Sequence, residues 1–73
     1  MRPIDYRAFC RYIESKGCRY IRTKGSHMIF KREGLKRPLV IPKDKEISTK
    51  VIRTNLQTLE ISTKQYEEEI KNF

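Results

Sequence analysis

His27 is the only histidine in the chain, and it directly follows Gly25-Ser26, a pair of residues typical of a turn. Histidine gains and loses a proton near neutral pH, so it is suited to general acid–base catalysis. Taken alone, a single histidine is more often structural than catalytic. Its surroundings in the fold therefore decide between these roles.

Basic residues flank His27 on both sides. Nearby positive charges disfavour a protonated imidazolium, so we expect the neutral ring, which is the general-base form. Cations at this spacing also suit a phosphate group, whose negative charge they would offset in a transition state. The candidate phosphate-binding residues are Arg22, Lys24, Gly25, Ser26, Lys31 and Arg32. For each cation the simpler alternative is a solvated surface charge, and for Ser26 it is a turn.

RNA cleavage is the reaction that such a group could perform without a metal. It needs a base that removes the proton of the 2′-hydroxyl and an acid that protonates the departing 5′-oxygen. One histidine cannot fill both roles at the same instant. Lys24 is our candidate for the acid, with water or an unidentified group as the alternatives.

The net charge of +8 on 73 residues favours a polyanionic partner. Residues 1–50 hold 14 Lys and Arg against 5 Asp and Glu, whereas residues 51–73 hold 3 against 4. The basic surface therefore belongs to the first two-thirds of the chain. A generic solubilising surface and an acidic protein partner remain alternatives to nucleic acid.

Other chemistries have weaker support in the sequence. Cys10 and Cys18 form no metal-binding pattern, and a buried thiol or, less simply, a Cys10–Cys18 bridge accounts for them. Glu67-Glu68-Glu69 points to different sides of a helix and is interpreted as a solvated face. We expect no metal and no cofactor. The cysteine usage favours the cytoplasm, and no apolar run approaches the length of a membrane span.

Helical periodicity marks both ends of the chain. The first stripe consists of Tyr6, Phe9, Cys10 and Ile13, bounded by Pro3 and Asp5 before it and Gly17 after it. The second consists of Ile52, Leu56 and Leu59, with Ser48 or Thr49 as the cap. The third consists of Tyr66, Ile70 and Phe73, preceded by the capping-box pattern Ser62-Thr63-Lys64-Gln65.

Three short strands are expected between the helices, at 18–24, 27–31 and 39–41. Alternation places His27, Ile29 and Lys31 on one face of the sheet and Met28 and Phe30 on the other. Pro42 is expected to end the ladder. Short turns indicate an antiparallel meander, and one layer of helices on one face buries the stripes. The prediction is one α+β domain over 1–73, in the α-β-β-β-α order of double-stranded RNA-binding domains, with a short additional C-terminal helix.

The stretch from Gly17 to Phe30 resembles the signature of the HicA (YcfA-like) family, in which a glycine, a basic strand and Gly-Ser-His precede an apolar strand. The resemblance continues through Val40-Ile41-Pro42, Lys50 to Leu59 and Ile61-Ser62, and covers roughly residues 6–73. It implies a toxin of a toxin–antitoxin pair that cleaves messenger RNA without a metal. It also implies that His27 is catalytic and that a HicB-like antitoxin covers the active site.

Two positions depart from the family pattern. Many members have a second histidine two residues after the proline, where this chain has Asp44. Any help that this histidine gives to catalysis is absent here or supplied by another group, so weaker activity is expected. Glu60 replaces a glycine that often follows the second helix. The alternatives to a ribonuclease toxin are a non-catalytic RNA- or DNA-binding module and a domain that binds only an acidic protein.

Overall fold

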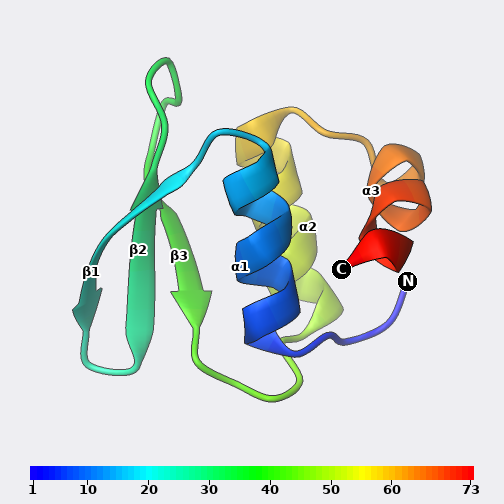
Figure 1. Cartoon of the computed structure of the whole chain (residues 1–73), viewed down its shortest axis with the longest axis horizontal. Coiled ribbons are helices and arrows are strands. Elements are labelled where there is room, and N and C mark those ends of the chain that lie inside the picture. Colours follow the sequence, from blue (N-terminus) through cyan, green and yellow to red (C-terminus); the bar gives the residue numbers. More distant parts are fainter.

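The computed structural model describes residues 1–73, and helices pack against one face of a small sheet (Figure 1). The elements in chain order are α1 (Tyr6–Ser15), β1 (Arg19–Lys24), β2 (His27–Lys31), β3 (Leu39–Pro42), α2 (Thr49–Leu59), α3 (Thr63–Glu69) and a final 3₁₀ turn, η1 (Ile70–Asn72). The predicted α+β class and the α-β-β-β-α order are confirmed. No helix is long and apolar enough to cross a membrane.

The sheet is an antiparallel meander in the order β1-β2-β3. Phe30 pairs with Leu39 and Met28 with Ile41, so these side chains share one face. Phe30, Leu39 and Ile41 are buried there beneath the helices. The alternation predicted for residues 27–31 is therefore confirmed, and the other face of the sheet has no helix over it (Figure 1).

Pro42 is the last residue of β3 and pairs with His27, so the ladder ends at the proline as expected. This last pair does not need a proline N–H, because the flanking hydrogen bond runs from the N–H of Lys43 to the carbonyl of Ser26 at 2.9 Å. One detail of the sheet was not expected: in β1 the register shifts between Tyr20 and Arg22, which marks a bulge at this edge.

Each helix begins at a polar cap. Asp5 and Ser48 accept hydrogen bonds from backbone N–H groups in the first turns of α1 and α2. Ser62 accepts from the N–H of Gln65 at 3.1 Å, but the Gln65 amide donates to Glu69 instead of returning to the cap. Only half of the expected capping box is formed.

The core lies between the sheet and the helices. Its buried members are Phe9, Cys10, Tyr12, Ile13, Cys18, Phe30, Leu39, Ile41, Ile47, Ile52, Leu56, Leu59 and Tyr66. Both cysteines are free thiols within it. Burial raises the pKa of Cys10 to about 11 and also raises that of Cys18, so neither is an activated nucleophile.

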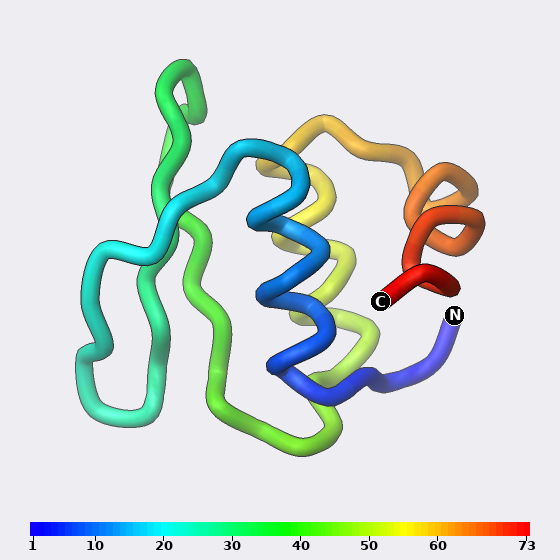
Figure 2. The backbone as a smooth tube through the Cα atoms, in the orientation of Figure 1, coloured from blue at the N-terminus to red at the C-terminus, as the bar shows by residue number.

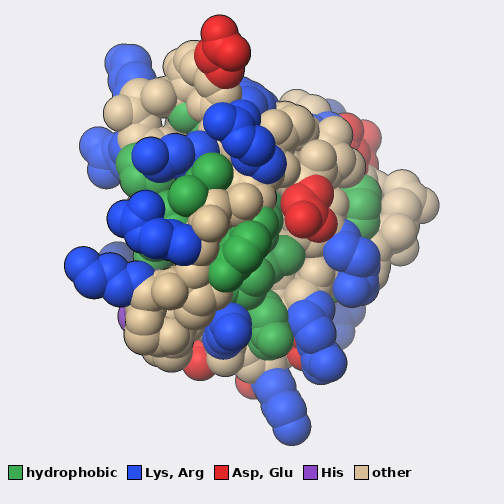
Figure 3. All heavy atoms as spheres, turned by 60° about the vertical axis from the view of Figure 1, so that its left-hand side comes forward, with side chains coloured by type: hydrophobic (Ala, Val, Ile, Leu, Met, Phe, Trp, Pro, Cys, Tyr) green, Lys and Arg blue, Asp and Glu red, His purple; other side chains and the backbone are tan.

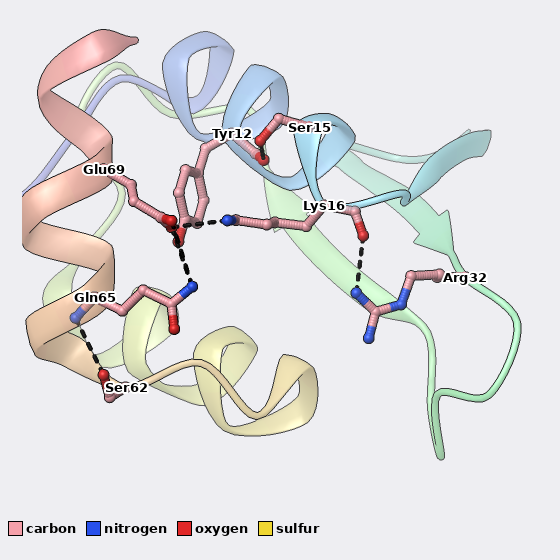
Figure 4. Close-up of polar contacts among 7 residues, drawn as sticks. All are labelled: Tyr12, Ser15, Lys16, Arg32, Ser62, Gln65 and Glu69. Atoms are coloured by element: carbon pink, nitrogen blue, oxygen red, sulfur yellow. Dashed lines mark hydrogen bonds and ion pairs between the residues drawn. The ribbon is translucent and has the colours of Figure 1, made fainter.

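The α3 helix packs on α1 through contacts that the apolar stripes did not predict. Tyr12 is fully buried, its ring meets that of Tyr66 edge-to-face at 5.2 Å, and its hydroxyl donates to Glu69 at 2.8 Å. Lys16 lies 2.8 Å from the same carboxylate (Figure 4). The hydrogen bonds from Lys16 and then Tyr12 lower the pKa of Glu69. Glu69 is therefore a docking residue rather than part of a merely solvated face.

Glu60 ends α2 in the left-handed conformation, with φ of 58°. A side chain in this region costs about 1 kcal/mol, which glycine avoids. We expect Glu60→Gly to raise the free energy of unfolding by about 1 kcal/mol and the melting temperature by about 4–8 °C. Glu60→Gln keeps the strained backbone and should change stability by less than about 0.5 kcal/mol. A glycine variant that melts below the wild type in a thermal scan would contradict the claim that the backbone at Glu60 is strained.

Candidate nucleic-acid interface

The uncovered face of the sheet, here called the open face, carries His27 and a set of cations. Residues paired across neighbouring strands project from the same face. Lys24 pairs with His27 and His27 with Pro42, while Arg22 pairs with Ile29 and Ile29 with Val40. At the other end Arg19 pairs with Lys31. The open face therefore consists of Arg19, Arg22, Lys24, His27, Ile29, Lys31, Val40 and Pro42.

His27 lies at the first position of β2, where the β1–β2 hairpin turns. Gly25 has φ of 62° and is followed by Ser26 without a positive φ, the pattern of a tight type II′ hairpin turn. The imidazole is exposed, and it makes no side-chain hydrogen bond or ion pair within the chain. The turn and the cross-strand pairs thus fix its backbone while the ring stays accessible.

Of the two lysines expected beside His27, only one is its neighbour. Lys24 is its direct cross-strand partner, and such partners have Cβ atoms about 5 Å apart. Lys31 shares the face but lies at the far end of β2. Arg22 lies two pairs along from Lys24, on the same face and opposite Ile29. Lys24 and Arg22 are therefore the cations placed to meet a group held at His27.

The electrostatics of the open face are uniformly positive. Residues 19–31 include Arg19, Arg22, Lys24 and Lys31 and no acidic residue, and none of these cations forms an ion pair. In Figure 3, Lys and Arg side chains gather over the strand end of the molecule, with hydrophobic side chains exposed beside them. On the open face, Val40 is paired with Ile29 and is 42% exposed. Such a surface suits a phosphate backbone with base or sugar contacts between the charges.

Arg32 occupies a different place from the one predicted. Its side chain is half-buried, and its guanidinium donates to the carbonyl of Lys16 at 2.8 Å, closing the end of α1 (Figure 4). A Cβ at Gly17 would lie 3.3 Å from the Arg32 side chain, so the two pack closely. Alternation also places Arg32 on the helix side of the sheet. Arg32 therefore serves the fold rather than the open face.

Asp44 lies in the connector after β3, where its carbonyl accepts a hydrogen bond from the N–H of Tyr6 at 3.0 Å. Its side chain is exposed. The connector is thereby held against the start of α1. Asp44 therefore provides an exposed carboxylate at the position where many members of the family that the sequence resembles have a second histidine, and His27 is the single imidazole of the chain.

The competing chemistries gain nothing from the geometry. Cys10 and Cys18 are buried in the core beneath the helices, whereas His27 projects from the opposite face of the sheet, so no Cys–His pair forms. No group of three His, Cys, Asp or Glu residues is arranged to hold a metal ion. Tyr20 is 47% exposed and alternates with basic residues, a pattern that would suit stacking on an RNA base. However, it lies on the helix side of β1, where its ring packs edge-to-face on Phe30 at 5.8 Å.

Three members of the open face, Arg19, Val40 and Pro42, are not among the candidate site residues that the sequence indicates. Their place depends on the register between strands, which no local pattern specifies. The bulge near Ile21 was the missing information for β1, because it resets the alternation between Tyr20 and Arg22.

The fold and the open face together define the class of protein: a small α-β-β-β-α domain with helices on one sheet face and a basic, histidine-bearing surface on the other. A family model described as the HicA toxin of bacterial toxin–antitoxin systems matches residues 6–61. The chain belongs to the HicA toxin family, as its sequence signature predicted. Membership implies an antitoxin partner. No curated protein and no solved structure matches the chain.

Proposed function

We propose that this HicA-family chain is a metal-independent endoribonuclease that cleaves messenger RNA, with His27 as its catalytic residue. The observation that carries the proposal is the exposed imidazole on the open face, paired across the strands with Lys24 and free of any side-chain partner. A site on an exposed sheet face admits a nucleic-acid strand without requiring a deep pocket.

The chemistry is that of a 2′-hydroxyl attacking its own phosphodiester. His27 acts as the base and removes the 2′-hydroxyl proton, the O2′–P bond forms, and the P–O5′ bond breaks. The departing O5′ takes a proton from an acid, for which Lys24 is the candidate because it is the nearest cation across the strands. Arg22 and Lys24 hold the phosphate and offset its charge, which is worth most when the donors are already in place.

Gly25 and Ser26 contribute by shaping the hairpin that presents His27, and the exposed Ser26 hydroxyl is available to a phosphate oxygen. Lys31 lies at the far end of β2, so it would contact the RNA strand away from the cleaved bond. Arg32 is not part of the proposed site, because its guanidinium is engaged with α1.

The proposed protein partner is a HicB-like antitoxin that covers the open face and so keeps RNA from His27. Exposed apolar side chains between unpaired cations, such as Val40, suit a protein surface as well as RNA. The antitoxin and RNA should therefore compete for the domain, and the pair would act in the cytoplasm, where messenger RNA is accessible.

The second candidate is a non-catalytic RNA- or DNA-binding module. Asp44 favours it, because this chain lacks the second histidine found in many family members. It predicts salt-sensitive binding without cleavage. A domain that binds only protein would show neither binding to nucleic acid nor cleavage.

The deciding experiment incubates the purified protein with RNA and with the same sequence in 2′-O-methyl form, each with and without EDTA. We expect cleavage of the RNA, unaffected by EDTA, and no cleavage of the 2′-O-methyl strand, which lacks the attacking hydroxyl. Both strands should bind equally well. Intact RNA at saturating protein would favour the binding module, and cleavage that stops in EDTA would contradict the metal-independent route.

A further inference from the structure

The loop between β2 and β3 is anchored along its length. At its start the Arg32 guanidinium is bonded to the end of α1. In its middle Leu35 packs against the core, and its N–H donates to the Arg32 carbonyl at 3.2 Å. Pro38 leads directly into β3. Lys36 and Arg37, the two exposed cations between these contacts, therefore lie on a loop whose backbone is fixed by the fold.

A groove of about 500 Å³ separates this loop from α2. Its walls are Arg32, Gly34, Leu35, Lys36 and Arg37 on the loop side and Thr54, Gln57, Thr58 and Glu60 on the helix side. The lining is almost entirely polar, so the groove does not suit an apolar ligand. We call it the loop groove.

The loop groove is positively charged and has unused hydrogen-bond donors. Lys36 and Arg37 form no ion pair, and Glu60 is the single acidic residue of the lining. The hydroxyls of Thr54 and Thr58 donate to helix carbonyls, which leaves the Gln57 amide as the free donor on the α2 wall. Two cations and an amide facing one groove are the chemistry that holds a phosphate group.

The loop groove lies at the opposite end of the sheet from His27. The β1–β2 turn beside His27 and the β2–β3 loop are at the two ends of the strands (Figure 2). The five residues of β2 separate them by roughly 14 Å, at about 3.4 Å for each step. Lys31, the last cation of the open face, directly precedes the loop. Lys31 and its cross-strand partner Arg19 therefore place two cations of the open face at the end of the sheet where the loop begins.

We propose that the loop groove is a second phosphate-binding subsite for the RNA strand, remote from the cleaved bond, with Lys36 and Arg37 as its cations. It rests on the proposed function in that the strand must also occupy the open face. The subsite adds affinity for strands long enough to reach both ends of the sheet. It takes no part in the chemistry at His27.

The test measures binding of 2′-O-methyl RNA strands of about 4 and about 16 nucleotides, by fluorescence anisotropy over a range of salt concentrations. These strands cannot be cleaved, so the readout is independent of catalysis. We expect the double variant Lys36→Ala, Arg37→Ala to bind the long strand several-fold more weakly. The salt slope of log affinity should fall by about 1.4, or about 0.7 for each cation lost. Affinity for the short strand should stay within about twofold.

The matched control removes two exposed cations on the far side of the molecule, Lys64→Ala with Lys71→Ala. It carries the same loss of net charge and should change both affinities less than the groove variant does. A gain-of-function variant, Gln57→Lys, guards against misfolding as the cause. It adds a cation to the α2 wall and should steepen the salt slope for the long strand by about 0.7.

In the RNA measurements, any one of three results would overturn the subsite: an unchanged affinity for the long strand, an equal loss for both strand lengths, or an equal loss in the control. Loss of binding to an acidic peptide, with RNA binding intact, would assign the groove to a protein partner and also overturn it. Failure of the wild type to cleave RNA would end the proposed function but leave this length dependence measurable.

Discussion

His27→Ala is expected to lower the rate of RNA cleavage by about 10²–10⁴-fold, the usual contribution of a general acid–base group. The side chain is exposed and has no partner within the chain, so its removal leaves no cavity and no unpaired buried group. Stability should change by less than about 0.5 kcal/mol. The measurement is the single-turnover rate at saturating protein, with binding of the 2′-O-methyl strand measured in parallel and expected to stay within about twofold.

Lys24 variants extend this result to the identity of the acid. Lys24→Ala removes both the charge and the proton, whereas Lys24→Arg keeps the charge but not a proton that can be transferred. If Lys24 is the acid, both variants lose rate to a similar extent. If it acts only on the phosphate charge, the arginine variant retains most of the activity. Undiminished cleavage by His27→Ala would contradict the site altogether.

Phe30→Ala is expected to be the most destabilising single change in β2, at about 3–5 kcal/mol. Phe30 is 1% exposed and lies beneath the helices, directly paired with the fully buried Leu39. A domain of this length has a total stability of about 4–11 kcal/mol, so this loss is a large part of it. Urea denaturation followed by circular dichroism should show a much lower midpoint or no folded baseline.

Val40→Ala is the control for this change, because Val40 is also a strand residue but lies on the open face and is 42% exposed. It should cost less than about 1 kcal/mol. Similar losses in the two variants would mean that the two faces of the sheet are not buried as differently as the structure shows.

The face on which His27 lies was predictable from residues 27–31, because alternation is local and Met28 and Phe30 are markedly apolar. The helix caps at Asp5 and Ser48 could also be predicted from the sequence, since each cap depends on a few adjacent residues. Even the replacement at Glu60 could be identified as unusual for the end of a helix. Its left-handed backbone gives that departure a physical meaning.

Long-range contacts were not predictable in the same way. Arg32 resembled any other cation beside His27, and its bond to the Lys16 carbonyl, 16 residues earlier, exists only once α1 is docked. Tyr12 lies beside the apolar stripe of α1 and is buried because α3 covers it. Lys36 and Arg37 face a groove because α2 forms its other wall. Each of these features depends on two elements meeting.

The most direct test of the central claim uses the single imidazole as its own reporter. Because the chain has one histidine, its ring Cε1–H proton gives one identifiable NMR signal. During titration with the non-cleavable 2′-O-methyl strand, we predict that this signal shifts and saturates with the affinity found by anisotropy. A signal that stays unmoved while RNA binds would place the nucleic acid elsewhere and contradict catalysis by His27.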